Sequence, residues 1–173
     1  RAVNLSFLFS NCCVKDSPPC PSIRVGVAVL GCGRVSDAHL EAIRACREFA
    51  RLDAVIDIDS NRAADAASRH GAPRALTSLE AALAIEDIEA VVVCLPNHLH
   101  GESTIAALQA GRHVLVEKPM ADSAPEAVRM AEAAESNARV LAVGQSRRHT
   151  TAVRYVVDNL ARFGRLRALH ESF

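Results

Sequence analysis

The chain has 173 residues; half of them are apolar, but only 3 % are aromatic, which is typical of small helices packed on a sheet. Its 20 Lys and Arg residues balance its 20 Asp and Glu residues, so charge gives no reason to expect binding to nucleic acid or to an anionic membrane. No apolar run approaches the ~20 residues of a membrane span. The six cysteines show no C-x-x-C spacing, so we expect no metal site and a cytoplasmic location.

Apolar runs alternate with helical patterns along the chain, which predicts a doubly wound α/β fold with a parallel sheet and right-handed crossovers. Strands are expected over residues 23–30, 52–57, 75–76, 90–95, 113–117 and 140–143. Helices are expected over residues 36–50, 60–70, 98–110 and 123–137, with a brief helix that starts at a capping box of Thr77 and Glu80.

The two ends of the chain depart from this alternation. Residues 1–22 combine a short apolar run with a Cys-Cys pair and a proline-rich cluster, and we expect a disordered leader there. Near the other end, one helical pattern over residues 150–160 precedes one strand pattern at 166–173. We therefore expect a sheet domain over residues 23–146 and the truncated start of a second α/β domain over residues 147–173.

A glycine-rich loop, residues 31–36, joins the first predicted strand to the first helix. Gly31 permits a tight turn, Gly33 lets a pyrophosphate approach the backbone, and Ser36 is small enough for helix–strand packing. The pattern predicts a dinucleotide site. An ordinary turn, or a site for S-adenosylmethionine, would use a similar loop.

An acidic residue, Asp57, ends the second predicted strand. Its carboxylate would accept hydrogen bonds from the adenosine ribose hydroxyls and repel a 2′-phosphate, which favours NAD over NADP. Asp59 competes for this role but is expected to cap the next helix with Ser60, and Arg62 could weaken the discrimination.

Further polar residues follow the later strands, at the edge where open α/β sheets bind ligands. Pro96 fixes a loop in which Asn97 either caps a helix or binds a ligand, and His100 either faces the ligand or is solvated. Lys118, in the sequence Glu-Lys-Pro, is a potential proton donor or an ion-pair partner of Glu117. The basic cluster at residues 147–149 is either a solvated linker or the wall of a pocket for an anionic or polyhydroxylated substrate.

Four segments resemble, in order and spacing, the glucose–fructose oxidoreductase and inositol dehydrogenase (Gfo/Idh/MocA) family. They are residues 27–34, 54–57, 95–100 and 111–119. The Glu-Lys-Pro motif is specific to that family, whereas the glycine loop is not. The resemblance implies an NAD(P)-binding Rossmann domain, a second α/β domain, and oxidation or reduction of sugars, inositols or related alcohols.

The resemblance also assigns roles to residues. Lys118 would be the catalytic lysine, Pro119 the proline that often follows a cis peptide bond, and Glu117 would lie at the nicotinamide end. Cofactor contacts are expected from ten residues: Gly31, Gly33, Arg34, Val35, Asp57, Leu95, Pro96, Asn97, His100 and Glu117.

The family's other catalytic residues and its dimer interface lie in the second domain, of which the chain holds only the start. We therefore expect negligible turnover by the chain alone, and no oligomeric state carries over. Our leading interpretation is a fragment of an oxidoreductase that moves hydride between a nicotinamide and a sugar or polyol. The alternative is a catalytically inactive dinucleotide-binding module.

Overall fold

Residues 24–165 are described by the computed structural model. The strands are Val25–Leu30 (β1), Ala50–Ile56 (β2), Ala75–Leu76 (β3), Ala90–Val93 (β4), His113–Val116 (β5) and Leu141–Val143 (β6). The α-helices are Ser36–Ala45 (α2), Ser60–His70 (α3), Leu79–Leu83 (α4), His100–Gln109 (α5), Ala124–Ser136 (α6) and Thr151–Asp158 (α7). Short 3-10 helices are Asn97–Leu99 (η1), Ser146–His149 (η2) and Leu160–Phe163 (η3).

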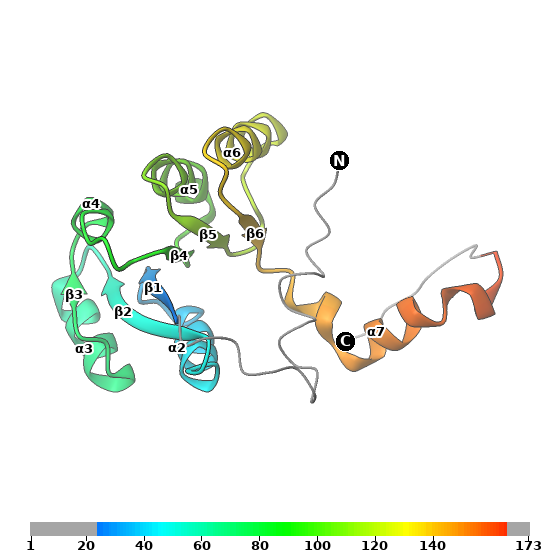
Figure 1. The fold of residues 1–173 in the computed structure, drawn as a ribbon, viewed down its shortest axis with the longest axis horizontal. Helices are drawn as coiled ribbons and strands as arrows, with labels where there is room; N and C mark the ends of the chain where they lie inside the picture. Colours follow the sequence, from blue (N-terminus) through cyan, green and yellow to red (C-terminus); the bar gives the residue numbers. More distant parts are fainter. Residues whose placement is uncertain (1–23, 166–173) are drawn as a thin grey trace.

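The strands form one parallel sheet in the order β3-β2-β1-β4-β5-β6. Figure 1 shows helices on both faces, with α2 and α3 on one side and α4, α5 and α6 on the other. From the carboxyl end of β1 the chain passes to α2 on one face of the sheet, and from the carboxyl end of β4 it passes to α5 on the other face. The carboxyl ends of these two strands therefore flank the crevice where such folds bind ligands. The doubly wound fold expected from the sequence is confirmed.

Side chains of the central strands alternate between two apolar layers. Along β4, Val91 and Val93 are fully buried in the layer beneath α4, α5 and α6, and Val92 packs in the layer beneath α2 and α3. Helices cover both faces, so these strands read as unbroken apolar runs rather than as alternating ones.

The first helix ends earlier than its sequence pattern predicts. It stops at Ala45 rather than near residue 50, because β2 already begins at Ala50, which pairs with Val25 of β1. The Val25 N–H also donates to the Phe49 carbonyl at 2.9 Å. Other strand ends lie within two residues of the predicted ones.

Most predicted helix starts are confirmed. The Asp59 side chain caps α3 by accepting from the Asn61 and Arg62 N–H groups, and Ser123 caps α6. The capping box predicted for the brief helix is wrong by one residue: the Ser78 hydroxyl, not that of Thr77, accepts from the Ala81 N–H at 3.2 Å.

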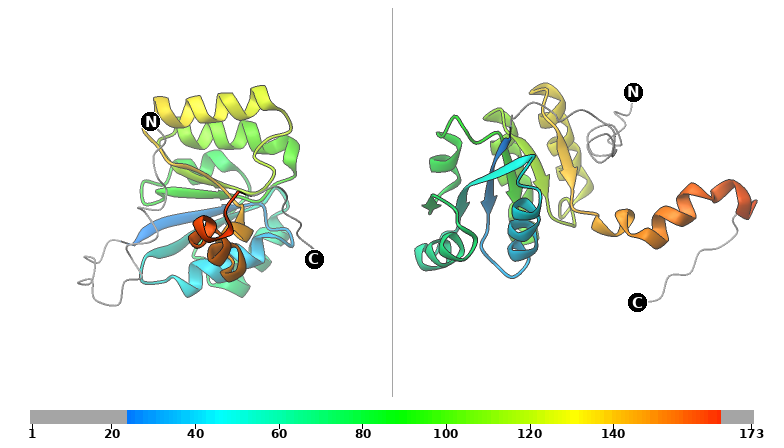
Figure 2. Two further views of the ribbon diagram at one scale, coloured as in Figure 1. Left: turned by 90° about the vertical axis from the view of Figure 1, so that its right-hand side faces the viewer. Right: turned by 60° about the horizontal axis from the view of Figure 1, so that its bottom comes forward.

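Residues 146–165, called the C-terminal segment here, extend away from the sheet (Figures 1 and 2). None of the side chains in η2, α7 and η3 is buried. The leader expected over residues 1–22 and the strand pattern at 166–173 lie outside the described residues. Within residues 24–165, no helix is both long and apolar enough to cross a membrane.

Candidate functional site

The predicted site residues meet at the carboxyl edge of the sheet, where the loops after β1, β2, β4 and β5 contact one another. The loop after β1 touches the end of β4, since an added Cβ on Gly31 would lie 2.5 Å from the Cys94 carbonyl oxygen. The Cys32 N–H donates to Asp57 after β2, and His39 of α2 contacts Glu117 after β5. Segments that are far apart in the sequence are therefore joined by side-chain and backbone contacts at one place.

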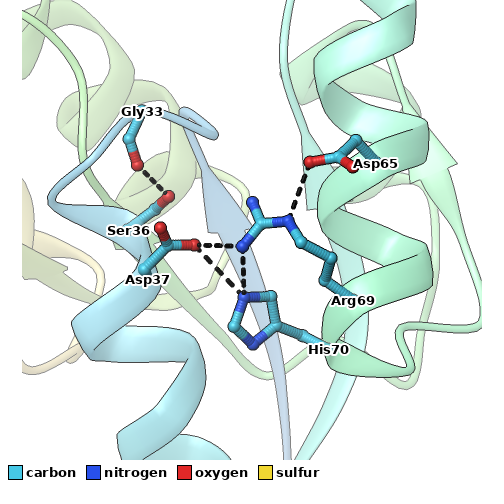
Figure 3. Close-up of polar contacts among 6 residues, drawn as sticks. All are labelled: Gly33, Ser36, Asp37, Asp65, Arg69 and His70. Atoms are coloured by element: carbon cyan, nitrogen blue, oxygen red, sulfur yellow. Dashed lines mark hydrogen bonds and ion pairs between the residues drawn. The ribbon is translucent and has the colours of Figure 1, made fainter.

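The glycine loop has the backbone that a dinucleotide site requires. Gly31 has φ +92°, in the left-handed region, and lacks room for a side chain against Cys94. An added Cβ on Gly33 meets no atom within 4 Å, so a ligand can approach the backbone there. The Ser36 hydroxyl donates to the Gly33 carbonyl at 2.5 Å, which closes the loop onto the first turn of α2 (Figure 3).

Asp57 joins the glycine loop to the turn before α3. Its side chain is 8 % exposed; Oδ2 accepts from the Cys32 N–H at 2.9 Å, and Oδ1 accepts from the Asp59 N–H at 2.9 Å. Arg62, which is 56 % exposed, places Nη2 3.0 Å from Oδ1. The carboxylate is thus held at the end of β2 with a cation beside it.

A second polar cluster fixes the helix that follows the glycine loop. Figure 3 shows the Arg69 guanidinium between two carboxylates: Nη1 lies 2.9 Å from Asp37 Oδ1 and Nε lies 2.8 Å from Asp65 Oδ2. His70 Nε2 lies 3.2 Å from the same Asp37 oxygen. Hydrogen bonds from Arg69 and His70 lower the pKa of Asp37. The start of α2 is therefore tied to the end of α3.

Glu117 is held by donors on both carboxylate oxygens. His39 Nε2 lies 2.8 Å from Oε1, and the Lys118 N–H donates to Oε2 at 2.9 Å. Burial raises the pKa of Glu117, but these hydrogen bonds and the nearby positive charges outweigh it, so that the pKa lies below its ordinary value. The carboxylate is ionised and bound at neutral pH.

Lys118 is exposed at the end of β5, and the Lys118–Pro119 peptide bond is cis, as the family resemblance implies. Within residues 24–165, no ion pair joins the Lys118 ammonium to Glu117 or to another carboxylate. The ion-pair alternative for Glu117 and Lys118 is therefore not observed, and the ammonium group is open to a ligand.

His100 occupies a different place from the one that the sequence suggested. Its side chain is fully buried, with Nδ1 2.8 Å from the Pro119 carbonyl oxygen and Nε2 2.8 Å from the Leu95 carbonyl oxygen. The ring has neither an exposed surface nor an unoccupied nitrogen to offer a cofactor. It lies beneath the site, where it links the loop after β4 to the segment after β5.

The remaining predicted cofactor residues lie around this edge. Arg34 and Val35 are exposed on the glycine loop, Pro96 and Asn97 are exposed after β4, and Leu95 is half-buried beside them. The basic cluster at residues 147–149 is exposed in η2.

Neither a metal centre nor a thiolate is found at the site. Among residues 24–165, no group of three or more His, Cys, Asp or Glu side chains could hold a metal ion. Burial, followed by the charge of Asp57, raises the pKa of Cys32 to about 11, and burial followed by the charge of Glu117 raises that of Cys94 to about 12. Both thiols stay protonated at neutral pH, so neither is a nucleophile.

Sequence reasoning missed His39, Arg69 and His70. Each acts through a side chain that meets a residue on another element, so only the topology brings the partners together. A local signal existed for two of them: Arg69 and His70 lie in the last turn of α3, where cations interact favourably with the helix dipole, and Asp37 lies in the first turn of α2.

A family model described as "Oxidoreductase family, NAD-binding Rossmann fold" (GFO_IDH_MocA) matches residues 25–145, well over half of the chain. The chain belongs to this family. The resemblance carried by the four segments is thereby confirmed, as is the Rossmann fold.

Curated relatives are oxidoreductases with longer chains. The chain is 32% identical over 134 residues to a 4-carboxy-2-hydroxymuconate-6-semialdehyde dehydrogenase of Sphingobium sp., a match that covers 78% of this chain and 42% of the relative. It is 38% identical over 112 residues to an inositol 2-dehydrogenase of Leifsonia xyli subsp. xyli, covering 65% of this chain and 32% of the relative. The chain thus spans less than half the length of these relatives.

Solved structures that resemble this chain are also oxidoreductases with longer chains. The WlbA dehydrogenase from Chromobactrium violaceum, in complex with NADH and UDP-GlcNAcA, superposes with a TM-score of 0.79 at 31% identity, covering 88% of this chain and 44% of the other. KijD10, a 3-ketoreductase from Actinomadura kijaniata in complex with NADP, gives a TM-score of 0.76 at 30% identity, covering 81% and 44%. One neighbour holds NADH and the other NADP, so family membership supports NAD and does not exclude NADP.

Proposed function

We propose that the chain is the cofactor-binding part of an oxidoreductase that transfers hydride between a nicotinamide and a sugar, inositol or related alcohol. The observation that carries this proposal is the meeting of the glycine loop, Asp57 and Lys118 at one edge of the sheet. In the family, these are the elements that serve the pyrophosphate, the adenosine ribose and the reacting hydroxyl.

Each element has a separate task. The backbone at Gly31 and Gly33 and the N-terminus of α2 bind the pyrophosphate, and the Asp57 carboxylate accepts hydrogen bonds from the ribose hydroxyls. When bound, the nicotinamide accepts or supplies the hydride. The Lys118 Nζ holds the proton of the substrate hydroxyl, and the loop from Leu95 to Asn97 lines the cofactor together with Arg34, Val35 and Glu117.

We infer that NAD is bound in preference to NADP. The Asp57 carboxylate is fixed at the end of β2 by the Cys32 and Asp59 amides, so it would stand against a 2′-phosphate. Arg62 neutralises part of that charge, which leaves NADP a weaker ligand rather than an excluded one.

The cofactor preference is tested with Asp57→Asn, which removes the charge and replaces one of the two accepting oxygens with a donating NH2 group. In a titration followed by NADH fluorescence, we expect this variant to lose about tenfold in affinity for NADH, as suits the loss of charge-assisted hydrogen bonds. Its affinity for NADPH should fall less. Asp158→Asn, exposed in α7, is the matched control and should bind both as the unaltered chain does. Tighter binding of NADPH than of NADH by the unaltered chain would contradict the preference.

We propose residues 23–146 as the dinucleotide domain and residues 147–173 as the start of the substrate domain. The end of the family match at residue 145 supports this boundary, as does the lack of buried side chains in η2, α7 and η3. Hydride transfer requires cofactor and substrate to be held together, and the second wall of the pocket belongs to the substrate domain. A cytoplasmic location fits this activity.

Turnover separates this proposal from the inactive binding module. We expect the chain alone to bind NADH but to oxidise myo-inositol or glucose negligibly. Joined to a substrate domain of a family member, it should regain turnover that Lys118→Ala abolishes. NADH binding without turnover in that longer protein would favour the binding module instead.

A further inference from the structure

We propose that His39 and His100 are positioning residues that hold the Lys118 segment (residues 117–119) from opposite faces of the sheet. The proposal rests on the catalytic role proposed above for Lys118. His39 belongs to α2 and His100 to α5, and these helices cover different faces in Figure 1. One histidine binds the residue before Lys118 and the other binds the residue after it.

His39 fixes the residue before Lys118. Its imidazole and the Glu117 carboxylate are 18% and 16% exposed, so their 2.8 Å contact is largely shielded from water. The other carboxylate oxygen accepts the Lys118 N–H. Gly144, after β6, leaves room for the carboxylate, because an added Cβ there would lie 3.1 Å from Glu117 Oε1. Holding Glu117 therefore also holds the backbone amide of Lys118.

His100 fixes the residue after Lys118. Each ring nitrogen lies 2.8 Å from a carbonyl oxygen, that of Pro119 at Nδ1 and that of Leu95 at Nε2. A carbonyl oxygen only accepts, so a neutral ring with one N–H satisfies one of them and an imidazolium satisfies both. The ring is fully buried, so the packing around it holds it in place.

The Lys118 side chain needs this support because little else in the described structure directs it. It is exposed and has no ion-pair partner within residues 24–165. The position of its Nζ is then set by the backbone from which the flexible stem begins. A displacement of about 1 Å at a reacting group can cost ~100-fold in rate, so a fixed backbone on both sides of Lys118 has a direct chemical use.

The amino-acid composition makes a direct test possible. Lys15 and Lys118 are the two lysines of the chain, so ¹⁵N-lysine labelling gives two amide signals, and Lys118→Arg identifies the one from Lys118. The solvent-exchange rate of this amide reports whether its hydrogen bond to Glu117 persists. The Lys15 signal provides an internal reference.

For His39, the alanine variant tests the contact and the glutamine variant tests rescue. We expect His39→Ala to raise the exchange rate of the Lys118 amide about fivefold, as suits the loss of one supporting hydrogen bond. His39→Gln carries a donor near the position of Nε2 and should stay within twofold of the unaltered chain. His70→Ala is the matched comparison, since it removes a histidine–carboxylate contact at Asp37 on the same helix without touching Glu117, and it should raise the exchange rate less than His39→Ala does.

For His100, two amide variants separate its two contacts. His100→Asn places a donor near Nδ1, beside the Pro119 carbonyl, and should keep the exchange rate of the Lys118 amide within twofold. His100→Gln places the donor near Nε2, beside the Leu95 carbonyl, and should raise that rate severalfold. Thr104→Ala, a buried substitution one turn along α5, is the control for packing. If neither His100 variant folds by circular dichroism, the His39 series decides the question.

The outcomes are separable from those of the cofactor titration, because exchange is measured without cofactor. An unchanged rate in both His39→Ala and His100→Gln would overturn the positioning role even if NADH binds. The positioning role would also be overturned if His39→Gln raised the exchange rate of the Lys118 amide as much as His39→Ala does. The expected pattern in a chain that binds no NADH would support the two contacts and contradict the proposed function.

Discussion

The sheet region (residues 24–145) and the C-terminal segment differ in how they dispose of their apolar side chains. In the sheet region, Leu40, Leu108 and Met130 are each 0% exposed between helix and sheet. In the C-terminal segment, Tyr155 and Phe163 are 59% and 51% exposed, and no residue of η2, α7 or η3 is buried. Both regions contain regular helices, so helix formation and burial are separate properties here.

The helices of the two regions differ in what stabilises them. An amphipathic helix gains most of its stability from packing its apolar face. Helices α3 and α5 pack on the sheet, whereas no side chain of α7 is buried among residues 24–165. Folding of the sheet region should therefore be cooperative and independent of the C-terminal segment.

The largest expected effect comes from the same substitution made in each region. Leu40→Ala removes a fully buried side chain beneath the sheet and should lower the free energy of unfolding by about 3 kcal/mol. Leu160→Ala, at a side chain that is 41% exposed, should change it by less than about 0.5 kcal/mol. Urea unfolding followed by far-UV circular dichroism measures both.

Tyrosine fluorescence provides a control on that measurement. Tyr155 is the single tyrosine, and the chain has no tryptophan, so intrinsic fluorescence reports on α7. A fluorescence transition that coincides with the dichroism transition, and that moves with it in Leu40→Ala, would show that the regions unfold together and would contradict the comparison.

The helix caps give a smaller contrast. The Asp59 carboxylate accepts from two backbone N–H groups at the start of α3, whereas Thr150, at the start of α7, makes no such side-chain bond. Asp59→Ala should therefore cost about 1 kcal/mol of unfolding free energy, and Thr150→Ala should cost much less. Equal losses in urea unfolding would mean that α7 contributes to the cooperative unit.

Acid should destabilise the sheet region through Glu117. Its pKa is lowered in the folded chain from an ordinary value of 4.5, so its contribution is present above pH 4.5 and is lost as the pH falls through the folded-state value. His39→Ala removes one of the hydrogen bonds that lower this pKa. It should therefore reduce the loss of unfolding free energy below pH 4.5, by less than the ~1 kcal/mol expected for Asp59→Ala. Urea midpoints measured between pH 3 and 6 test this, with His98→Ala, at an exposed histidine of η1, as the control.

The smallest expected effect is a gain. The Thr104 hydroxyl is buried in α5 and has no hydrogen-bond partner among residues 24–165. Thr104→Val replaces it with a methyl group of similar shape and should raise the unfolding free energy by a few tenths of a kcal/mol. Thr151→Val, exposed in the first turn of α7, should leave it unchanged. A loss of stability in Thr104→Val would imply that the hydroxyl has a partner.

Much of the fold was predictable because its signals are local. The run Val91–Val93 marks a strand covered on both faces, and Gly71, with φ +73°, marks the end of α3. The start of β2 was not predictable, because Ala50 becomes a strand residue only through its pairing with Val25. Strand ends depend on the neighbouring strand, which the local sequence does not contain.

The site, too, has residues that the sequence predicts and residues that it does not. Gly31, Asp57 and Lys118 stand next to predicted strand ends, so the topology of a parallel sheet already places them at one edge. The contacts of His39 and His100 depend on the side-chain direction of residues that are 78 and 19 positions from their partners. A motif identifies such a residue but does not say whether its side chain faces a ligand or the interior.

The contact between His39 and Glu117 also has a consequence for the time at which the site forms during synthesis. The two residues are 78 positions apart, and a ribosome adds about 5–20 residues per second. The glycine loop and α2 must therefore wait ~4–16 s for the segment that completes the site. A nascent chain halted before residue 117 would hold the glycine loop and His39 without the carboxylate that His39 contacts.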